Sequence, residues 1–176
     1  MMRRMQPAPH NAVTLERRTR SHAEELFAVL AEPLLYEHLD EGPPPSVAWL
    51  RDRFVRSESG LSPDGSEQWL NWAVRDAARQ MVGYVQATIF PPGEAHVAYV
   101  FGSAHWGRGL AFDAVGQMLH ILATQFGVTT FMLVTERANT RSVRLAHRLG
   151  FAPATEERSA RAGLTPTEQM FQRGPA

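Results

Sequence analysis

The spacing of apolar residues divides this chain into helical and extended segments. In some segments apolar residues recur every three or four positions, as on one face of a helix, and in others they alternate or run together, as in strands. The predicted elements, in chain order, are a strand at residues 13–17, a helix at 23–30, a helix that begins at residue 47, strands at 69–74, 81–90 and 96–101, a helix at 109–126, a strand at 131–135, a helix at 139–149 and a strand at 167–172. This order predicts one domain built on one mixed α/β sheet.

Local signals mark where several of these elements begin and end. Ser21, with a glutamate three residues later, has the spacing of a capping box, which predicts that Ser21 caps the first helix. Ser46 follows three prolines and precedes the second helix, and Gly127 follows the longest helix, where a glycine often ends one. Residues 1–11 are expected to form a loose tail, so that the domain occupies residues 12–173.

Composition excludes several classes of protein. The 176 residues carry 18 basic and 18 acidic side chains, so the formal net charge is zero and no nucleic-acid partner is expected. The absence of cysteine excludes disulfides, thiolate metal sites and cysteine nucleophiles. No apolar run approaches the ~20 residues of a membrane-spanning helix, and the N-terminal residues lack the apolar stretch of a signal peptide. We therefore expect a soluble cytoplasmic protein with no membrane partner.

The most informative segment leads from a predicted strand through a turn into the longest helix. It runs from Trp106 to Ala111 with the sequence Trp-Gly-Arg-Gly-Leu-Ala. Glycine lets a ligand approach the main chain closely, and the first amides of a helix point outward at the positive end of its dipole. Gly107 and Gly109 thus indicate a phosphate or pyrophosphate site, to which Arg108 adds a charge. A glycine-containing loop without a ligand is the simpler alternative.

Motifs for other chemistry are absent from the sequence. No Gly-Lys-Ser/Thr follows the glycines, and no third glycine completes a dinucleotide-binding fingerprint. The seven histidines show no metal-ligand spacing, and no serine lies in a Gly-x-Ser-x-Gly elbow. Metalloenzymes, P-loop proteins and α/β hydrolases are therefore not expected.

A second informative segment starts the predicted helix at 139–149. Asn139 is a good helix cap, Ser142 follows at the third helical position, and the helix ends in Leu-Gly-Phe. A cap of this kind requires no ligand, so by itself the segment is consistent with a purely structural role.

Together, the two segments resemble the GNAT acyl-CoA N-acyltransferases, and among these the ribosomal-protein-alanine N-acetyltransferase (RimJ/RimL) subgroup. The resemblance covers roughly residues 13–172. It implies a single mixed, mostly antiparallel sheet flanked by helices, with the fourth and fifth strands splayed apart. It also implies acetyl-CoA as co-substrate, no metal, and transfer of the acetyl group to a primary amine, either on a small molecule or at a protein N-terminus.

The resemblance also implies roles for individual residues. Amides from Gly107 onward would hold the coenzyme A pyrophosphate, the main chain near Phe101 would pair with the pantetheine arm, and Asn139 would line the arm's other side. The implied cofactor-binding residues are Val100, Phe101, Trp106, Gly107, Arg108, Gly109, Leu110, Ala111, Asn139 and Ser142. Two positions depart from the family pattern: Trp106 replaces a Gln or Arg, and Ala146 replaces the tyrosine that serves many relatives as general acid.

Catalysis by such a protein needs an acid for the leaving thiolate and a base for the attacking ammonium. With Ala146 unable to donate a proton, Ser142 or a water molecule is the remaining donor. The candidate bases are Glu37, His38, Glu94, His96 and His105.

Two other functions remain open at the level of sequence. A non-catalytic acyl-CoA-binding sensor or assembly module would keep the same motifs and dispense with the tyrosine. A nucleotide-binding regulator is disfavoured because its phosphate motifs are absent. The acceptor amine is equally open between a protein N-terminus, an amino acid, a polyamine and an antibiotic, and the protein is expected to be a monomer or a homodimer.

Overall fold

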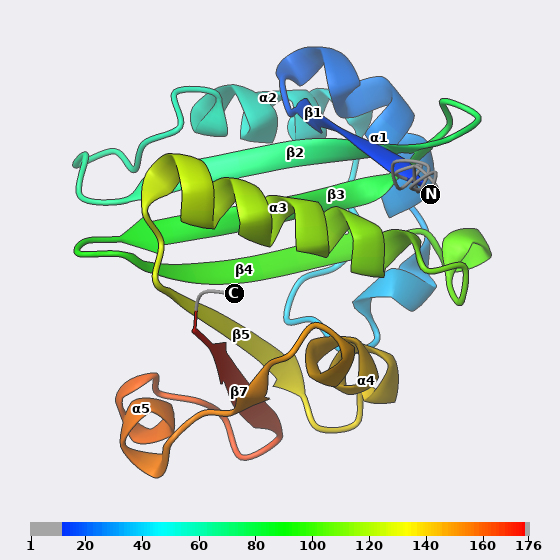
Figure 1. Cartoon of the computed structure of the whole chain (residues 1–176). Helices are drawn as coiled ribbons and strands as arrows, with labels where there is room; N and C mark the ends of the chain where they lie inside the picture. The colour runs from blue at the N-terminus through cyan, green and yellow to red at the C-terminus, as the bar shows by residue number, and fades with distance from the viewer. Residues whose placement is uncertain (1–11, 175–176) are drawn as a thin grey trace, which may run out of the picture.

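The computed structural model describes residues 12–174, and the expected tail at residues 1–11 lies outside them. Within the described residues, a seven-stranded sheet has the strand order β1-β2-β3-β4-β5-β7-β6 (Figure 1). The strands are β1 (Val13–Arg17), β2 (Gln68–Asp76), β3 (Met81–Phe90), β4 (Glu94–Phe101), β5 (Thr130–Glu136), β6 (Ala152–Pro153) and β7 (Glu168–Arg173). Among the strands that the structure describes, only the β4–β5 pair runs parallel, which confirms the predicted mixed, mostly antiparallel sheet.

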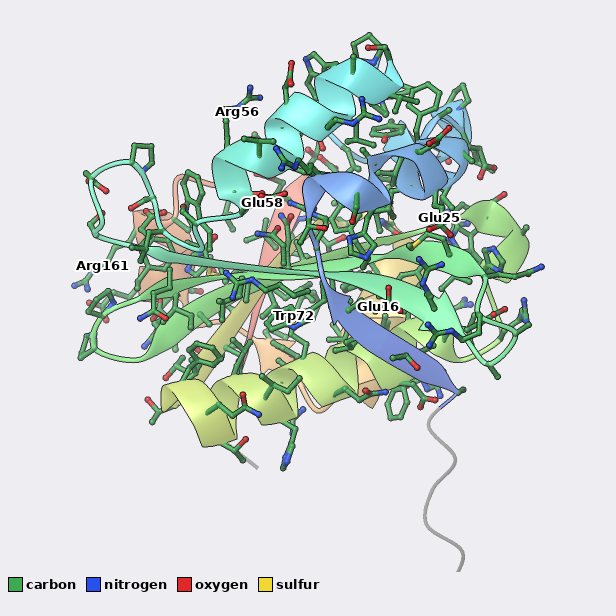
Figure 2. The ribbon with its side chains drawn as sticks, turned by 90° about the horizontal axis from the view of Figure 1, so that it is seen from above. Glu16, Glu25, Arg56, Glu58, Trp72 and Arg161 are labelled. Atoms are coloured by element: carbon green, nitrogen blue, oxygen red, sulfur yellow. The ribbon has the colours of Figure 1, made fainter. Side chains whose placement is uncertain are left out.

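Helices cover both faces of the sheet, as the view along it shows (Figure 2). One face carries α1 (Ala23–Leu30) and α2 (Val47–Ser57), and the other carries α3 (Leu110–Phe126). The remaining helical segments are η1 (Arg20–His22), η2 (Pro33–Tyr36), η3 (Ser103–His105), α4 (Thr140–Arg148) and α5 (Glu156–Arg161). None of the helices in residues 12–174 has both the length and the apolar character that crossing a membrane requires.

Each face of the sheet buries its own apolar cluster. On the α3 side, Met118 and Leu122 are fully buried against strand residues such as Val85. On the other side, Leu26 of α1 and Phe54 of α2 pack together over β2 and β3. Because successive strand residues point to opposite faces, the two clusters hold the same strands from both sides.

Most predicted boundaries are confirmed, and the exceptions have local causes. Ser46 caps α2 by accepting a hydrogen bond from the Trp49 amide at 3.1 Å, and Gly127 ends α3 with a φ of 65°. The prediction that Ser21 caps the first helix was wrong: Ser21 lies inside η1, which Thr19 caps. Short β6 and α5 were missed because segments of this length carry no recognisable period.

Strands β4 and β5 separate after a short parallel contact. They pair through Glu94 with Thr130, Ala95 with Phe131 and His96 with Met132, and no further. On its other edge β5 pairs with β7 from Phe131 to Glu136, and among residues 12–174 no strand pairs with the C-terminal half of β4 on the β5 side. This confirms the splayed fourth and fifth strands, which diverge near the start of α3 and α4 (Figure 1).

Candidate active site

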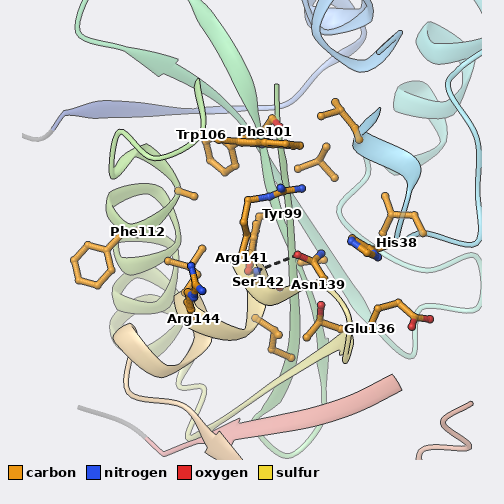
Figure 3. A pocket seen from close by; sticks show the side chains of 18 of the residues that line it. His38, Tyr99, Phe101, Trp106, Phe112, Glu136, Asn139, Arg141, Ser142 and Arg144 are labelled. Atoms are coloured by element: carbon orange, nitrogen blue, oxygen red, sulfur yellow. Dashed lines mark hydrogen bonds between the residues drawn. The ribbon is translucent and has the colours of Figure 1, made fainter. Parts of the chain in front are cut away.

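A cavity of about 560 Å³ occupies the opening between β4 and β5 (Figure 3). Its walls come from the C-terminal half of β4, the end of β5, the start of β7, the first turn of α3, α4, and η2 with the segment that follows it. Nine of the ten expected cofactor-binding residues line it: Val100, Phe101, Trp106, Gly107, Gly109, Leu110, Ala111, Asn139 and Ser142. The tenth, Arg108, does not line it; its guanidinium lies 3.9 Å from the carboxylate of Asp76 at the β2–β3 turn.

Unpaired main-chain amides form one end of the cavity. Gly107 and Gly109 have φ values of 73° and 81°, a region that favours glycine, and neither has a heavy atom within 4 Å of the place where a Cβ would stand. Within residues 12–174, no amide from Gly107 to Phe112 donates a hydrogen bond to the rest of the chain, and Asp113 makes the first helical bond, to Gly109. A row of free amides at the positive end of a helix suits phosphate oxygens.

Arginine side chains of α4 add positive charge at the same end. Arg141, Arg144 and Arg148 line the cavity from successive turns of the helix. The guanidinium of Arg141 stacks on the Trp106 ring, 3.6 Å from its centroid, and the Trp106 indole donates a hydrogen bond to the Phe101 carbonyl at 2.8 Å. Trp106 therefore joins the glycine turn to both β4 and α4.

The register of β4 decides which of its main-chain groups face the opening. The Gly102 amide donates to the Val82 carbonyl. In an antiparallel ladder this bond identifies Phe101 and Gly83 as a non-hydrogen-bonded pair. The polar main-chain groups of Phe101 and Tyr99 consequently point into the opening. Those of Val100 point to Tyr84 on β3, so Val100 reaches the cavity but does not offer its amide there.

A pair of hydroxyl groups lies at the middle of the cavity. The amide of Ser142 donates to Oδ1 of Asn139 at 3.1 Å, which confirms Asn139 as the cap of α4. The hydroxyl of Ser142 lies 2.8 Å from that of Tyr99 (Figure 3). Burial raises the pKa of Tyr99, and the hydrogen bond with Ser142 offsets only part of this rise.

Tyr99 was not among the residues expected from the sequence. Strand alternation placed it on the same face as Val97 and Phe101, but nothing local indicated a hydroxyl partner on a helix that is 43 positions away in sequence. Ala146 occupies the position where many relatives carry the tyrosine that acts as general acid. It is fully buried in the α3-side cluster and does not line the cavity.

The opposite end of the cavity carries histidine and carboxylate side chains. His38 and Asp40 line it from the segment after η2, and Glu136 and Glu168 line it from register-paired positions of β5 and β7. Leu34 and Leu39 supply apolar surface there. In Figure 3, His38 and Glu136 lie on the side of the cavity opposite Arg144. The cavity thus separates basic side chains at one end from acidic ones at the other.

Two of the candidate bases lie away from the cavity. Glu94 stands at the closed end of β4, where it accepts a hydrogen bond from Arg158 at 2.6 Å and contacts His96 at 3.2 Å. Burial raises the pKa of Glu94, but the bonds from Arg158 and His96 outweigh it and hold the pKa below its ordinary value. His96 does not line the cavity either. The structure therefore offers neither residue a path to the opening.

Glu37, His38 and His105 lie nearer to the cavity. The Glu37 carboxylate is 60% exposed and 4.0 Å from the imidazole of His38, and Glu37 itself is not a lining residue. His105 lines the turn before the glycines and lies 3.2 Å from Arg108. Of the expected bases, only His38 faces the acidic end.

A sheet that opens between two parallel strands, with a glycine turn and free helix amides at the mouth, defines an acyl-CoA N-acyltransferase fold. The acetyltransferase (GNAT) domain family matches residues 12–152. The chain belongs to this family of N-acetyltransferases.

Individual relatives agree with this assignment. An uncharacterized N-acetyltransferase p20 of Bacillus licheniformis is 23% identical over 141 residues, which are 79% of this chain and 78% of the relative. Spermidine N-acetyltransferase from Vibrio cholerae, solved with CoA and spermine, has a similar structure with a TM-score of 0.76 at 16% identity, covering 94% of this chain and 97% of the other. The ribosomal L7/L12 α-N-protein acetyltransferase RimL, solved with coenzyme A, has a TM-score of 0.74 at 17% identity, covering 93% and 94%.

Proposed function

We propose that this protein transfers the acetyl group of acetyl-CoA to a primary amine by direct attack in a ternary complex. The observation that carries the proposal is the charge-separated cavity between β4 and β5. One end has free amides and arginines, the other has His38 and carboxylates, and two hydroxyls lie between them. A bound thioester and an ammonium group therefore have complementary places on either side of one reaction centre.

Coenzyme A would occupy the glycine-turn end. The amides from Gly107 to Phe112 would bind the pyrophosphate, with Arg144 and Arg148 near the remaining 3′-phosphate. The pantetheine arm would extend the sheet beside β4, pairing with the main chain of Phe101 and Tyr99 in the place that β5 leaves empty. One of these amides would polarise the thioester carbonyl as an oxyanion donor.

The amine would enter at the acidic end. Alkyl ammonium groups have a pKa of about 10, so the acceptor arrives charged and must lose a proton before it attacks. Carboxylates of Glu136 and Glu168 attract the ammonium, and His38 is placed to take its proton and pass it to solvent. Orientation of amine and thioester within one cavity supplies much of the remaining rate.

A thiol-release assay tests the proposal. The purified protein is mixed with acetyl-CoA and a panel of amines that includes spermidine, an aminoglycoside and an N-terminal peptide, because relatives of similar fold act on amines of these kinds. The protein has no cysteine, so every thiol that appears comes from coenzyme A. Amine-dependent thiol release with a matching acetylated product supports the proposal.

Calorimetry with acetyl-CoA separates failure of binding from failure of transfer. Micromolar affinity, about −8 kcal/mol, without turnover of any amine would favour the alternative of a non-catalytic acyl-CoA-binding module. Absence of binding at millimolar acetyl-CoA would overturn the proposal altogether.

A further inference from the structure

Two hydroxyl groups meet at the centre of the cavity with no charged group bonded to either. Among residues 12–174, the hydroxyls of Tyr99 and Ser142 hydrogen-bond only to each other, at 2.8 Å. We propose that Tyr99 is the catalytic acid that protonates the leaving thiolate of coenzyme A. Ser142 assists by donating its own hydroxyl hydrogen to the phenolic oxygen. This inference rests on the proposed function.

The two residues are held from opposite walls of the opening. Tyr99 projects from the unpaired half of β4, and its ring packs against the α3-side cluster. Ser142 lies in the first turn of α4, where its amide is tied to the Asn139 side chain. The pair therefore spans the gap that the thioester must enter, and both hydroxyls are fixed by packing and capping.

Acid strength decides which hydroxyl gives up its proton. A phenol has a pKa of about 10 and a thiol about 8.5, so a phenol is a much better proton donor to a nascent thiolate than an aliphatic hydroxyl, which is a far weaker acid. Burial raises the pKa of Tyr99 by more than the hydrogen bond with Ser142 lowers it, so the phenol keeps its proton throughout the neutral range. Tyr99 is therefore a proton source at the pH where an amine is acetylated.

The bonds and protons of the step balance. The ammonium first loses one proton through His38, and the neutral amine nitrogen then forms a bond to the thioester carbon. The second proton that the nitrogen loses also leaves through His38 to solvent. The carbon–sulfur bond then breaks with its electron pair on sulfur, and the proton of the Tyr99 hydroxyl moves to that sulfur. The phenolate that forms is stabilised by the Ser142 hydroxyl and regains a proton from water, so that the products are an N-acetyl amine and free coenzyme A.

Tyr99 thereby supplies a phenol that α4 does not carry. Ala146 is fully buried in the core and offers neither a hydroxyl nor room for one. Tyr99 instead brings its hydroxyl to Ser142 from β4, on the other side of the cavity. This explains how a chain without a tyrosine at position 146 can still protonate the thiolate.

Matched variants test the assignment through turnover. Tyr99→Phe removes one oxygen and should lower kcat about a hundredfold, at the low end of general-acid effects, with the Kd for acetyl-CoA changed less than about threefold. Ser142→Ala should lower kcat about tenfold, and the double variant should match Tyr99→Phe alone, because Ser142 acts through the phenol. Tyr84→Phe makes the same chemical change on β3, outside the lining of the cavity, and should leave kcat within about twofold.

A second measurement needs no acceptor. The thiolate of bound coenzyme A absorbs ultraviolet light, and with no cysteine in the protein no other thiolate contributes; the spectrum of the protein without coenzyme A is subtracted to remove its tyrosines. A phenol that donates to sulfur stabilises the thiolate, so Tyr99→Phe should raise the pKa of the bound thiol by about one unit, a tenfold effect. The charged side chains that line the cavity around the pair are His38, Asp40, His105, Glu136, Arg141, Arg144, Arg148 and Glu168, and the substitution changes none of them.

These experiments distinguish failure of the Tyr99 assignment from failure of the proposed acetyltransferase function. If Tyr99→Phe turns over within threefold of the parent and leaves the bound thiol's pKa unchanged, Tyr99 is not the acid, although the protein remains an acetyltransferase. If Ser142→Ala loses more activity than Tyr99→Phe, Ser142 is the donor and the assignment is overturned. If the parent protein binds no coenzyme A, the proposed function and the inference both fail.

Discussion

The two ends of β4 belong to one strand of regular register but lie in different surroundings. At the Glu94 end, β4 pairs with β5, and Arg158 and His96 enclose the carboxylate. At the Phe101 end, β5 no longer pairs with β4, and the main chain of β4 faces a cavity. The closed end holds the sheet together, and the open end leaves hydrogen-bonding groups available for a ligand. Residues of β4 that pair with β5 therefore stabilise the sheet, whereas residues beyond the last pair can contact a ligand.

The largest expected effect is at the open end, from Gly109→Glu. A carboxylate among the free amides would occupy the phosphate position and repel the phosphates, so acetyl-CoA binding should weaken by more than about a hundredfold, or ~2.7 kcal/mol. Gly163→Glu is a matched control, because Gly163 also has a positive φ, 64°, with nothing within 4 Å of an added Cβ, and it lies away from the cavity. Calorimetry on both variants decides: equal affinities would disprove the pyrophosphate position.

His38 provides the next test, at the acceptor side of the open end. His38→Gln should lower kcat/KM for the amine about tenfold to a hundredfold near neutral pH, because the ammonium would lose its proton acceptor. Glu37→Gln, at the neighbouring exposed position, should change it less than about threefold. Steady-state kinetics over pH 6–9 would show this. A larger loss from Glu37→Gln would instead make the carboxylate the base.

Ala146→Tyr tests whether a phenol can be placed on α4. Many relatives carry their general-acid tyrosine at this position, but Ala146 is fully buried here. Overpacking of this kind costs ~1–3 kcal/mol, so the variant should unfold at lower denaturant and should not rescue Ser142→Ala. Urea unfolding followed by circular dichroism measures the first effect. A variant of parent stability with restored turnover would show that the helix can shift to admit the ring.

The smallest effect is expected at the closed end, from Glu94→Gln. The pKa of Glu94 is held below its ordinary value of 4.5, so its ion pair stabilises the fold above that pH and is lost as pH falls through the lowered pKa. The partly exposed pair is worth at most ~1 kcal/mol. Parent and variant should therefore differ at pH 6 and converge towards pH 3 in urea unfolding, with kcat unchanged at pH 7.5. Loss of activity in a stable variant would return Glu94 to the list of bases.

Much of the fold and the cofactor end of the site could be predicted from the sequence. Helical and strand periods gave the order of the main elements, and the glycines at 107 and 109 and the cap at Asn139 were recognised from a few neighbouring residues. Such features depend on contacts within one or two turns of chain, which are written in consecutive residues. The incorrect cap at Ser21 shows the limit, because Thr19 and His22 formed a competing local bond.

The acceptor end and the hydroxyl pair were decided only by the tertiary structure. Tyr99 meets Ser142, His38 reaches the same cavity as Glu136, and Glu94 is removed from it, because β4 and β5 diverge after three paired positions. Which residues pair across β4, β5 and β7 depends on segments far apart in the sequence, and no short stretch of sequence encodes it. The sequence by itself determined which groups were available for chemistry, and the packing of distant segments determined which of them face one another.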